Sequence, residues 1–292
     1  MEIYIPKKTL ILNSHGLSDY QKCPQLFGYT NIQNLEPAMT YLPFAKGTLI
    51  STLLERYYTL QINDKLNKDN VWNVIQTTLY NESNPIRDDK ELMPFLEMRM
   101  LQYWKFYQKE SWVTIAVEEG YSKTIYEDDS HLFVYEGRPD WTGYIDKEMN
   151  KLVHADHKSQ SRHDNIYPFN NQALGYCWAS EIDIFIYNYF GLQTTGKPED
   201  WFRRVPQRFS KQQIETWQNE TIQWFFKILK DRERLKSWQC TGKYGVCAYK
   251  KLCEASEDWI RKDLINREFK SRHYQSWEVK DEALPHLSTD QE

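Results

Sequence analysis

The sequence lacks any long apolar run, and no stretch reaches the length of a signal peptide or a membrane span. We therefore expect a cytoplasmic protein that does not enter a membrane. Its formal net charge of −4 lacks the strongly basic balance of proteins that coat nucleic acid, but it allows an enzyme with a local basic groove. Internal repeats and low-complexity linkers are also absent, so the 292 residues favour one domain with a substantial core.

The order of the predicted elements indicates an α/β protein. Helical spacing of apolar residues predominates up to residue 110, with Ser18 as the expected N-cap of the first helix. Alternation with a period of two then predicts strands over 112–146 and 151–159, with a hairpin turn at 127–131. The remaining elements are a helix at 169–181, a strand at 182–193, a long amphipathic helix at 210–238 and a helix near 256–270.

These elements predict a single domain with three parts. The parts are a helical N-terminal part (1–110), a core (111–236) and a cysteine-bearing C-terminal extension (237–292).

The stretch GRPDWTGYIDKEMNKLVHADHKSQS carries Asp140, Asp156 and Lys158. Asp156 follows a short apolar strand, where a carboxylate is costly unless something such as a divalent cation pairs with it. Because side chains alternate along a strand, Asp156 and Lys158 project from the same face. Asp-x-Lys triplets are common on surfaces, so this pattern alone also allows a simple surface ion pair.

The wider context resembles a known nuclease signature. Pro139-Asp140, followed by Asp156-His157-Lys158, resembles the motif of the PD-(D/E)XK nuclease superfamily. Downstream, "QALGY" places Gln172 and Tyr176 four residues apart on one helix face, and it resembles the Q-x-x-x-Y motif of the RecB-type branch. That branch includes the CRISPR adaptation nucleases and AddB-like helicase–nucleases.

The resemblance implies a restriction-endonuclease-like core, with a central mixed sheet flanked by helices. It implies that Asp140 and Asp156 hold Mg²⁺ or Mn²⁺ and that Lys158 supports the nucleophile or the transition state. Gln172 and Tyr176 are expected to hold the DNA backbone.

Two further motifs bear on the metal ligands. "AVEE" resembles the additional acidic position of the branch, with Glu118 as the better match and Glu119 as its neighbour. The resemblance then implies that Glu118 and the main-chain carbonyl of His157 complete the metal shell. "GTLISTLLE" resembles the motif G-x-x-x-H-x-x-L-E and retains Glu55, but Ser51 stands at the histidine position. Either the other ligands suffice or the site is weakened.

The cysteines form the second signal. Cys240, Cys247 and Cys253 cluster near the end of the chain, and Cys23 stands more than 200 residues earlier. An odd total of five in a reducing compartment argues against disulfide bonds, and no tight C-x2-C pair of the zinc-finger type is present. A four-cysteine metal site and four metal-free thiols both remain open on spacing alone.

Here too a resemblance adds to the pattern. "SDYQKCPQLF" resembles the first cysteine element of the RecB-type iron–sulfur nucleases, which carry three more cysteines after the core. It implies a [4Fe-4S] cluster held by Cys23, Cys240, Cys247 and Cys253, which would tie the two ends of the chain together. Cys177 lies on an apolar helix face and is expected to be an ordinary buried cysteine.

Taken together, these resemblances imply a metal-dependent DNA exonuclease that prefers single-stranded ends. Its organisation is similar to that of stand-alone phage or prophage exonucleases, which implies recombination or replication proteins as partners. One alternative is a DNA-binding or assembly protein with a degenerate nuclease site, for which Ser51 is the sequence indication. Another is a zinc-stabilised scaffold with no nucleic-acid role.

Overall fold

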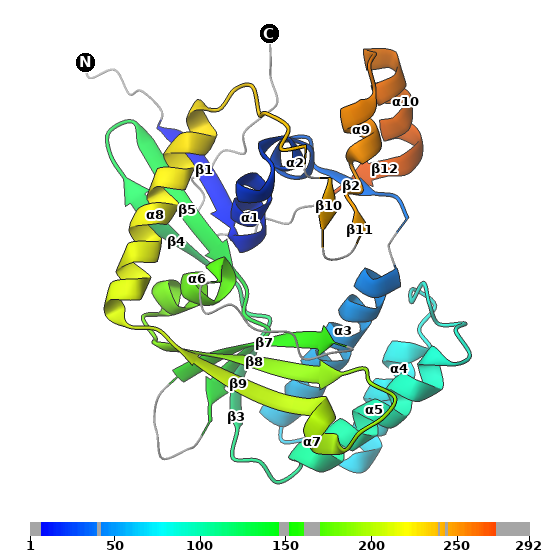
Figure 1. Cartoon of the computed structure of the whole chain (residues 1–292). Coiled ribbons are helices and arrows are strands. Elements are labelled where there is room, and N and C mark those ends of the chain that lie inside the picture. The colour runs from blue at the N-terminus through cyan, green and yellow to red at the C-terminus, as the bar shows by residue number, and fades with distance from the viewer. Residues whose placement is uncertain are drawn as a thin grey trace, which may run out of the picture. The chain divides into compact units, whose positions relative to one another are not determined.

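The computed structural model describes residues 7–39, 42–145, 152–160, 170–238, 240–242 and 245–272 (Figure 1). Its chain divides into two compact units, each made of separate segments. Unit 1 comprises residues 1–39, 120–137 and 212–292, and unit 2 comprises residues 40–119 and 138–211. Both units combine helices with mixed sheets, which confirms the α/β class. Within the described ranges, no helix is long and apolar enough to cross a membrane.

Unit 2 contains a five-stranded sheet in the order β3-β6-β7-β8-β9 (Figure 1). The strands are β3 (Val113–Val117), β6 (Trp141–Tyr144), β7 (Leu152–Gln160), β8 (Ile184–Gly191) and β9 (Phe202–Arg208). β7 and β8 run parallel, and α6 (Asn171–Ser180) lies between them in the chain, as a parallel connection requires. All eight residues of β8 are buried, which fits a strand covered on both faces.

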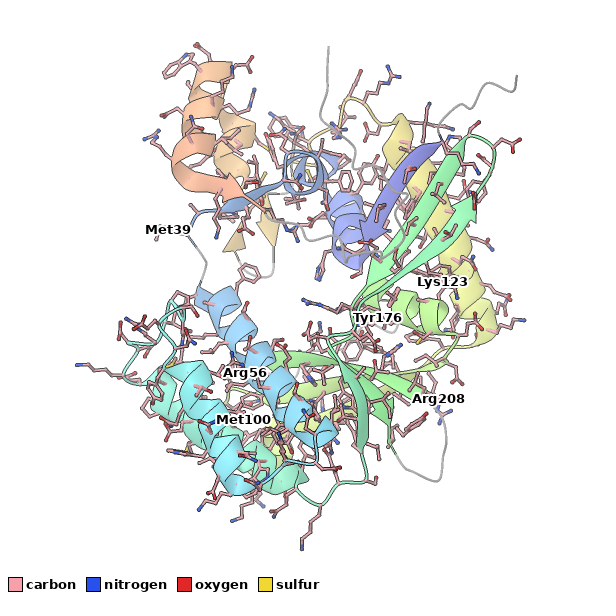
Figure 2. All side chains as sticks on the ribbon, turned by 180° about the vertical axis from the view of Figure 1, so that it is seen from behind. Met39, Arg56, Met100, Lys123, Tyr176 and Arg208 are labelled. Atoms are coloured by element: carbon pink, nitrogen blue, oxygen red, sulfur yellow. The ribbon has the colours of Figure 1, made fainter. Side chains whose placement is uncertain are left out.

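The other helices of unit 2 are α3 (Leu42–Ile62), α4 (Lys68–Leu79), α5 (Leu92–Tyr107) and the short α7 (Pro198–Trp201). α3 contacts β3 and β7, α4 packs against α3 and α5, and α7 contacts β8 and β9. Arg56 and Met100, labelled in Figure 2, lie on α3 and α5. The apolar side chains of α3 and α5 share one core with Ala155 and Ile186 of the sheet. Asp156 alternates with Ala155, so it projects from the opposite face of β7.

Unit 1 contains a three-stranded sheet in the order β1-β5-β4. Its strands are β1 (Lys8–Asn13), β4 (Tyr121–Glu127) and β5 (His131–Gly137). The predicted hairpin turn is confirmed, since β4 and β5 are antiparallel and Asp128 Oδ1 accepts hydrogen bonds from the main-chain N–H groups of Ser130 and His131. α8 (Lys211–Lys230) packs on this sheet, with the rings of Phe133 and Phe225 5.1 Å apart.

The rest of unit 1 joins segments from both ends of the chain. The early segments are α1 (Ser14–Lys22), α2 (Pro24–Phe27), the π-helix η1 (Gly28–Ile32) and β2 (Leu35–Pro37). The late ones are β10 (Thr241–Gly242), β11 (Gly245–Val246), α9 (Lys250–Glu254), α10 (Asp258–Glu268) and β12 (Phe269–Ser271). β2 pairs with β12, and Tyr29 and Leu35 share a small core with Tyr249, Leu252 and Phe269.

The predicted start of the first helix was wrong. Asn13, and not Ser18, caps α1, because its side chain accepts a hydrogen bond from Gly16 N at 2.9 Å. Cys23 then has an extended backbone, as expected of a residue before proline, and the chain restarts as α2 at Pro24. Cys23 therefore lies at a break between two helices.

Candidate functional site

In unit 2, the antiparallel pairing of β6 with β7 brings the two predicted aspartates together. Asp140 immediately precedes β6, and its Oδ2 atom accepts a hydrogen bond from the main-chain N–H of His157 at 2.6 Å. On β7, Nζ of Lys158 lies 2.5 Å from Oδ2 of Asp156. The residues Asp140, Asp156 and Lys158 thus form one site, here called the acidic site.

Burial makes the acidic site electrostatically demanding. Asp156 is 3% exposed, and its Oδ2 atom has the lysine close by but makes no hydrogen bond of good geometry. Burial, reinforced by the charge of Asp156, raises the pKa of Asp140 well above its usual value. Burial alone would lower the pKa of Lys158, but the attraction of Asp156 and Asp140 outweighs it, so this pKa is raised. One buried and one half-buried carboxylate beside a single lysine favour an additional cation.

Gln172 and Tyr176 of α6 also lie at the acidic site, and Figure 2 labels Tyr176. Gln172 donates through Nε2 to Oδ1 of Asp156 at 2.8 Å and accepts through Oε1 from Lys158 at 3.2 Å. The same amide is 3.2 Å from the hydroxyl of Tyr176, which in turn donates to the carbonyl of Arg138 at 2.8 Å. The expected sharing of one helix face is confirmed, and Gln172 tethers both charged side chains of β7.

Glu118 was predicted on a strand, but it lies just beyond the end of β3. Its backbone is left-handed, with φ 53°, which a non-glycine residue adopts only under local constraint. Its carboxylate is 2.7 Å from Nε of Arg138. Burial raises the pKa of Glu118 against the opposing charge of Arg138, and Glu55 and Asp156 raise it further. Glu118 is therefore electrostatically part of the acidic site, although it is paired with an arginine.

Arg138 was missed by the sequence reasoning, although it immediately precedes the Pro139-Asp140 pair. The first motif of the resemblance lies on α3, which contacts both β3 and β7. Gly47 of that motif faces Ser159, since a Cβ atom at Gly47 would lie 3.7 Å from Oγ of Ser159. Glu55, one of the neighbours that raise the pKa of Glu118, comes from the same helix.

The fit of a hard cation to the acidic site rests on donor chemistry. Over the described part of the chain, no three His, Cys, Asp or Glu side chains converge as a ready-made metal-binding group. The carboxylates nevertheless suit Mg²⁺ or Mn²⁺, which prefer oxygen ligands, and Oδ2 of Asp156 is buried without a hydrogen bond. Asp156 is paired with Lys158 and Glu118 with Arg138, so cation binding would compete with these two ion pairs.

In unit 1, four thiols line one cavity of about 230 Å³. They belong to the four predicted ligands Cys23, Cys240, Cys247 and Cys253. Cys177 is instead fully buried on α6 of unit 2, as predicted, and burial raises the pKa of its thiol to about 12. The cavity is also lined by the lysines Lys22, Lys236 and Lys250.

The surroundings of the thiol cavity shift the pKa values of Cys23 and Cys253 in opposite directions. Burial alone would raise the pKa of Cys23, but hydrogen bonds from Ser237 and from the main-chain N–H groups of Leu26 and Gln25 outweigh it and lower this pKa. Burial raises the pKa of Cys253 in spite of the nearby charge of Lys236, which donates to the carbonyl of Cys253 at 2.5 Å. The four thiols line one cavity, although they do not converge as a ready-made metal-binding group among the described residues. Sulfur donors are the kind that an iron–sulfur cluster or zinc would take.

Comparisons with known proteins add little to this geometry. No protein-family model matches the chain, and no curated protein matches it. A solved structure described as "Crystal structure of SSO0001" is similar over 81% of this chain and 82% of that chain, with 13% sequence identity and a TM-score of 0.34. A similarity at that level transfers neither fold nor function to this chain.

Proposed function

We propose that the chain is a metal-dependent deoxyribonuclease, an exonuclease that prefers single-stranded DNA ends, with a restriction-endonuclease-like core in unit 2. The observation that carries the proposal is the acidic site itself. Asp156 is buried on β7, Asp140 immediately precedes the paired strand β6, Lys158 lies 2.5 Å from Asp156, and Gln172 is bound to both residues of β7. An ordinary surface Asp-x-Lys pair would have neither the burial nor the amide.

A divalent cation held by Asp140 and Asp156 would act as a Lewis acid on the phosphodiester and activate a water molecule. Lys158 provides a positive donor for the charge that develops on the phosphate. Gln172 keeps the Asp156 carboxylate and the Lys158 ammonium in a fixed orientation through its two amide ends. Glu118 and the carbonyl of His157 are the further oxygen donors in this proposal.

The thiol cavity of unit 1 is proposed to hold a [4Fe-4S] cluster. Cys23, Cys240, Cys247 and Cys253 would be its ligands, and the three lysines of the cavity would offset their negative charge. The cluster would supply structural cross-linking between the early and late segments of unit 1. Partners of such an enzyme would be DNA ends and the recombination or replication proteins that generate them.

The direct test uses end-labelled single-stranded and double-stranded DNA with Mg²⁺ or Mn²⁺. The wild-type chain should shorten single strands from an end, and Asp156→Ala should lose at least about 100-fold in rate because it removes metal charge. Asp88→Ala is the matched control, since that carboxylate is 96% exposed and lies elsewhere in unit 2. A wild-type protein that cleaves no DNA with either metal would contradict the proposal.

A second candidate function is DNA binding or assembly without cleavage. Ser51 at the histidine position and the Glu118–Arg138 ion pair favour it, because both reduce the free ligands of the acidic site. In that case fluorescently labelled DNA should bind without being cut. Ser51→His should then create metal-dependent cleavage that wild type lacks, whereas for an active nuclease it should change an existing rate.

A further inference from the structure

A row of three polar side chains lies behind the acidic site, on the other face of the same sheet. His157, Asn188 and Arg204 are register partners on the neighbouring strands β7, β8 and β9. Because side chains alternate along β7, His157 points away from Asp156 and Lys158 and toward the helices that cover this face. We call these three residues the polar row.

Asn188 connects the polar row and is fully buried. Its Nδ2 atom donates to Nδ1 of His157 at 2.9 Å and to the hydroxyl of Tyr103 at 2.8 Å. Its Oδ1 atom is 3.4 Å from Nε of Arg204. The imidazole of His157 is further held by near-parallel stacking on Tyr58, with centroids 5.4 Å apart and 14° between the planes.

Arg204 anchors the far end of the row. It forms an ion pair with Glu110 and donates through Nη2 to the hydroxyl of Tyr58 at 2.9 Å. Its guanidinium lies over the rings of Trp112 and Tyr107, 3.4 Å and 3.8 Å from their centroids. Cation–π contact with both rings, together with a charged partner, fixes the side chain in orientation as well as in position.

Stability does not explain such a row. A buried ion pair is often no more stabilising than well-packed apolar side chains of the same volume. Moreover, Nε2 of His157 and Oε1 of Glu110 are buried without a hydrogen bond within the described residues, which is a cost that leucine would avoid. Instead, the directional hydrogen bonds of the polar row fix the orientation of the His157 side chain and, through it, the backbone of β7.

That backbone is the part of the sheet on which the acidic site depends. The main-chain N–H of His157 donates to Oδ2 of Asp140 at 2.6 Å, and His157 stands between Asp156 and Lys158. A small rotation of the His157 peptide would move the carboxylates of both β6 and β7. Groups behind metal ligands that fix such orientations are worth about 10–100-fold in metal affinity or activity.

We infer that His157, Asn188 and Arg204 are positioning residues that hold the His157 peptide so that Asp140 and Asp156 can bind a divalent cation together. This inference rests on the proposed function for the role of the cation, but its test does not depend on cleavage. The side chains of these residues lie on the face of the sheet away from the acidic site, so they act through the backbone of β7, whose His157 N–H binds Asp140 and whose His157 carbonyl is a proposed cation ligand.

Two buried tyrosines supply a matched pair of variants. Tyr103→Phe removes a hydroxyl that accepts from Asn188, whereas Tyr57→Phe removes a hydroxyl of the same core that has no hydrogen-bond partner among the described residues. A stronger pair uses His157 itself: His157→Leu removes the acceptor for Asn188, and His157→Asn keeps an oxygen acceptor at nearly the same place. All four retain the main-chain N–H that serves Asp140.

The measurement is Mn²⁺ binding to the full chain by titration calorimetry without DNA, with Asp156→Ala as the background and with Tm recorded for every variant. His157→Leu should weaken Mn²⁺ binding about 10–100-fold, and Tyr103→Phe should weaken it by a smaller factor. His157→Asn should recover most of the affinity, and Tyr57→Phe should match wild type. In the cleavage assay, His157→Leu should lower kcat while KM for DNA stays within about twofold.

The inference is overturned if His157→Leu and Tyr103→Phe bind Mn²⁺ as wild type does. It is also overturned if Mn²⁺ affinity merely follows Tm across all variants, Tyr57→Phe included, because the row would then serve only core packing. A wild-type chain that binds Mn²⁺ but cuts no DNA contradicts the proposed function alone, and the Mn²⁺ affinities still decide the role of the row. A wild-type chain that takes up no Mn²⁺ contradicts both.

Discussion

At the scale of single residues, the ionised carboxylates that the acidic site needs for cation binding lower the stability of the fold. Burial and the neighbouring Asp156 raise the pKa of Asp140, so the folded protein keeps a proton there that the unfolded chain has already lost. As pH rises from the usual aspartate range to the raised pKa, the free energy of unfolding therefore falls, and above the raised pKa the loss is complete. Cation binding would return part of this loss.

Asp140→Asn should therefore raise Tm of the metal-free protein at pH above that raised pKa, because the amide keeps an acceptor for His157 N–H without the buried charge. The gain should shrink as pH falls toward 4 and also when Mn²⁺ is added to both proteins. Asp128→Asn should instead lower Tm at neutral pH. Hydrogen bonds from Tyr126, Ser130 and His131 hold the pKa of Asp128 at about 2, so the stability that this carboxylate contributes is lost only in acid, where the two proteins should converge. Thermal unfolding followed across pH checks both signs, and a destabilised Asp140→Asn would contradict the account.

Glu118 and Glu119 offer a second comparison between neighbouring residues. Glu118 is half-buried, is paired with Arg138 and lies within the electrostatic reach of Asp156, whereas Glu119 is exposed. Glu118→Ala should cost about tenfold or more in cleavage rate if its carboxylate is a cation ligand, and Glu119→Ala should cost little. Steady-state kinetics at several Mn²⁺ concentrations measure the difference. Equal, small losses for both variants would show that other groups close the metal shell.

At the scale of elements, local patterns were predictable and distant pairings were not. The hairpin at 127–131, strand β7 and the shared face of Gln172 and Tyr176 follow from short-range periodicity, and the structure confirms them. Strand β9 was missed because its sequence FRRVPQR carries three arginines and a proline, a pattern that suits an edge strand and resembles a loop. The Glu110–Arg204 pair spans 94 positions, so only the tertiary register brings it together.

The cap of α6 gives a prediction at this scale. Asn170 accepts from Gln172 N at 2.8 Å, just as Asn67 caps α4 by accepting from Asn70 N at 3.0 Å. Asn170→Ala and Asn67→Ala should each cost about 1 kcal/mol of stability. Asn170→Ala alone should also slow DNA cleavage, because the first turn of α6 orients Gln172 toward Asp156. Denaturant unfolding and cleavage rates separate the two effects, and equal activity of the two variants would show that the cap is purely structural.

At the scale of the whole molecule, described segments from early and late in the chain meet in unit 1. The pairing of β2 with β12 and the small core around Tyr29 and Tyr249 join them through protein contacts alone. The proposed cluster would add a second closure between Cys23 and the late cysteines, across more than 200 residues of chain. Closing so long a loop restricts the unfolded chain strongly, so the added stability should be large and should depend on the metal.

Protein purified without oxygen should therefore be brown, with a broad absorption at about 400 nm, as for thiolate-ligated iron–sulfur centres. It should also contain iron and sulfide in equal amounts. Cys23→Ser and Cys247→Ser should lose the colour and a large part of the stability, whereas Cys177→Ser should keep both, because Cys177 belongs to unit 2 and does not line the thiol cavity. The β2–β12 pairing predicts that the colourless variants remain folded at low temperature, with faster proteolysis confined to unit 1.

A colourless wild-type protein with one zinc per chain would show that the cavity binds zinc and not a cluster, and it would leave the proposal for the acidic site unchanged. Loss of colour in Cys177→Ser alone would show that the thiol cavity is not the metal site.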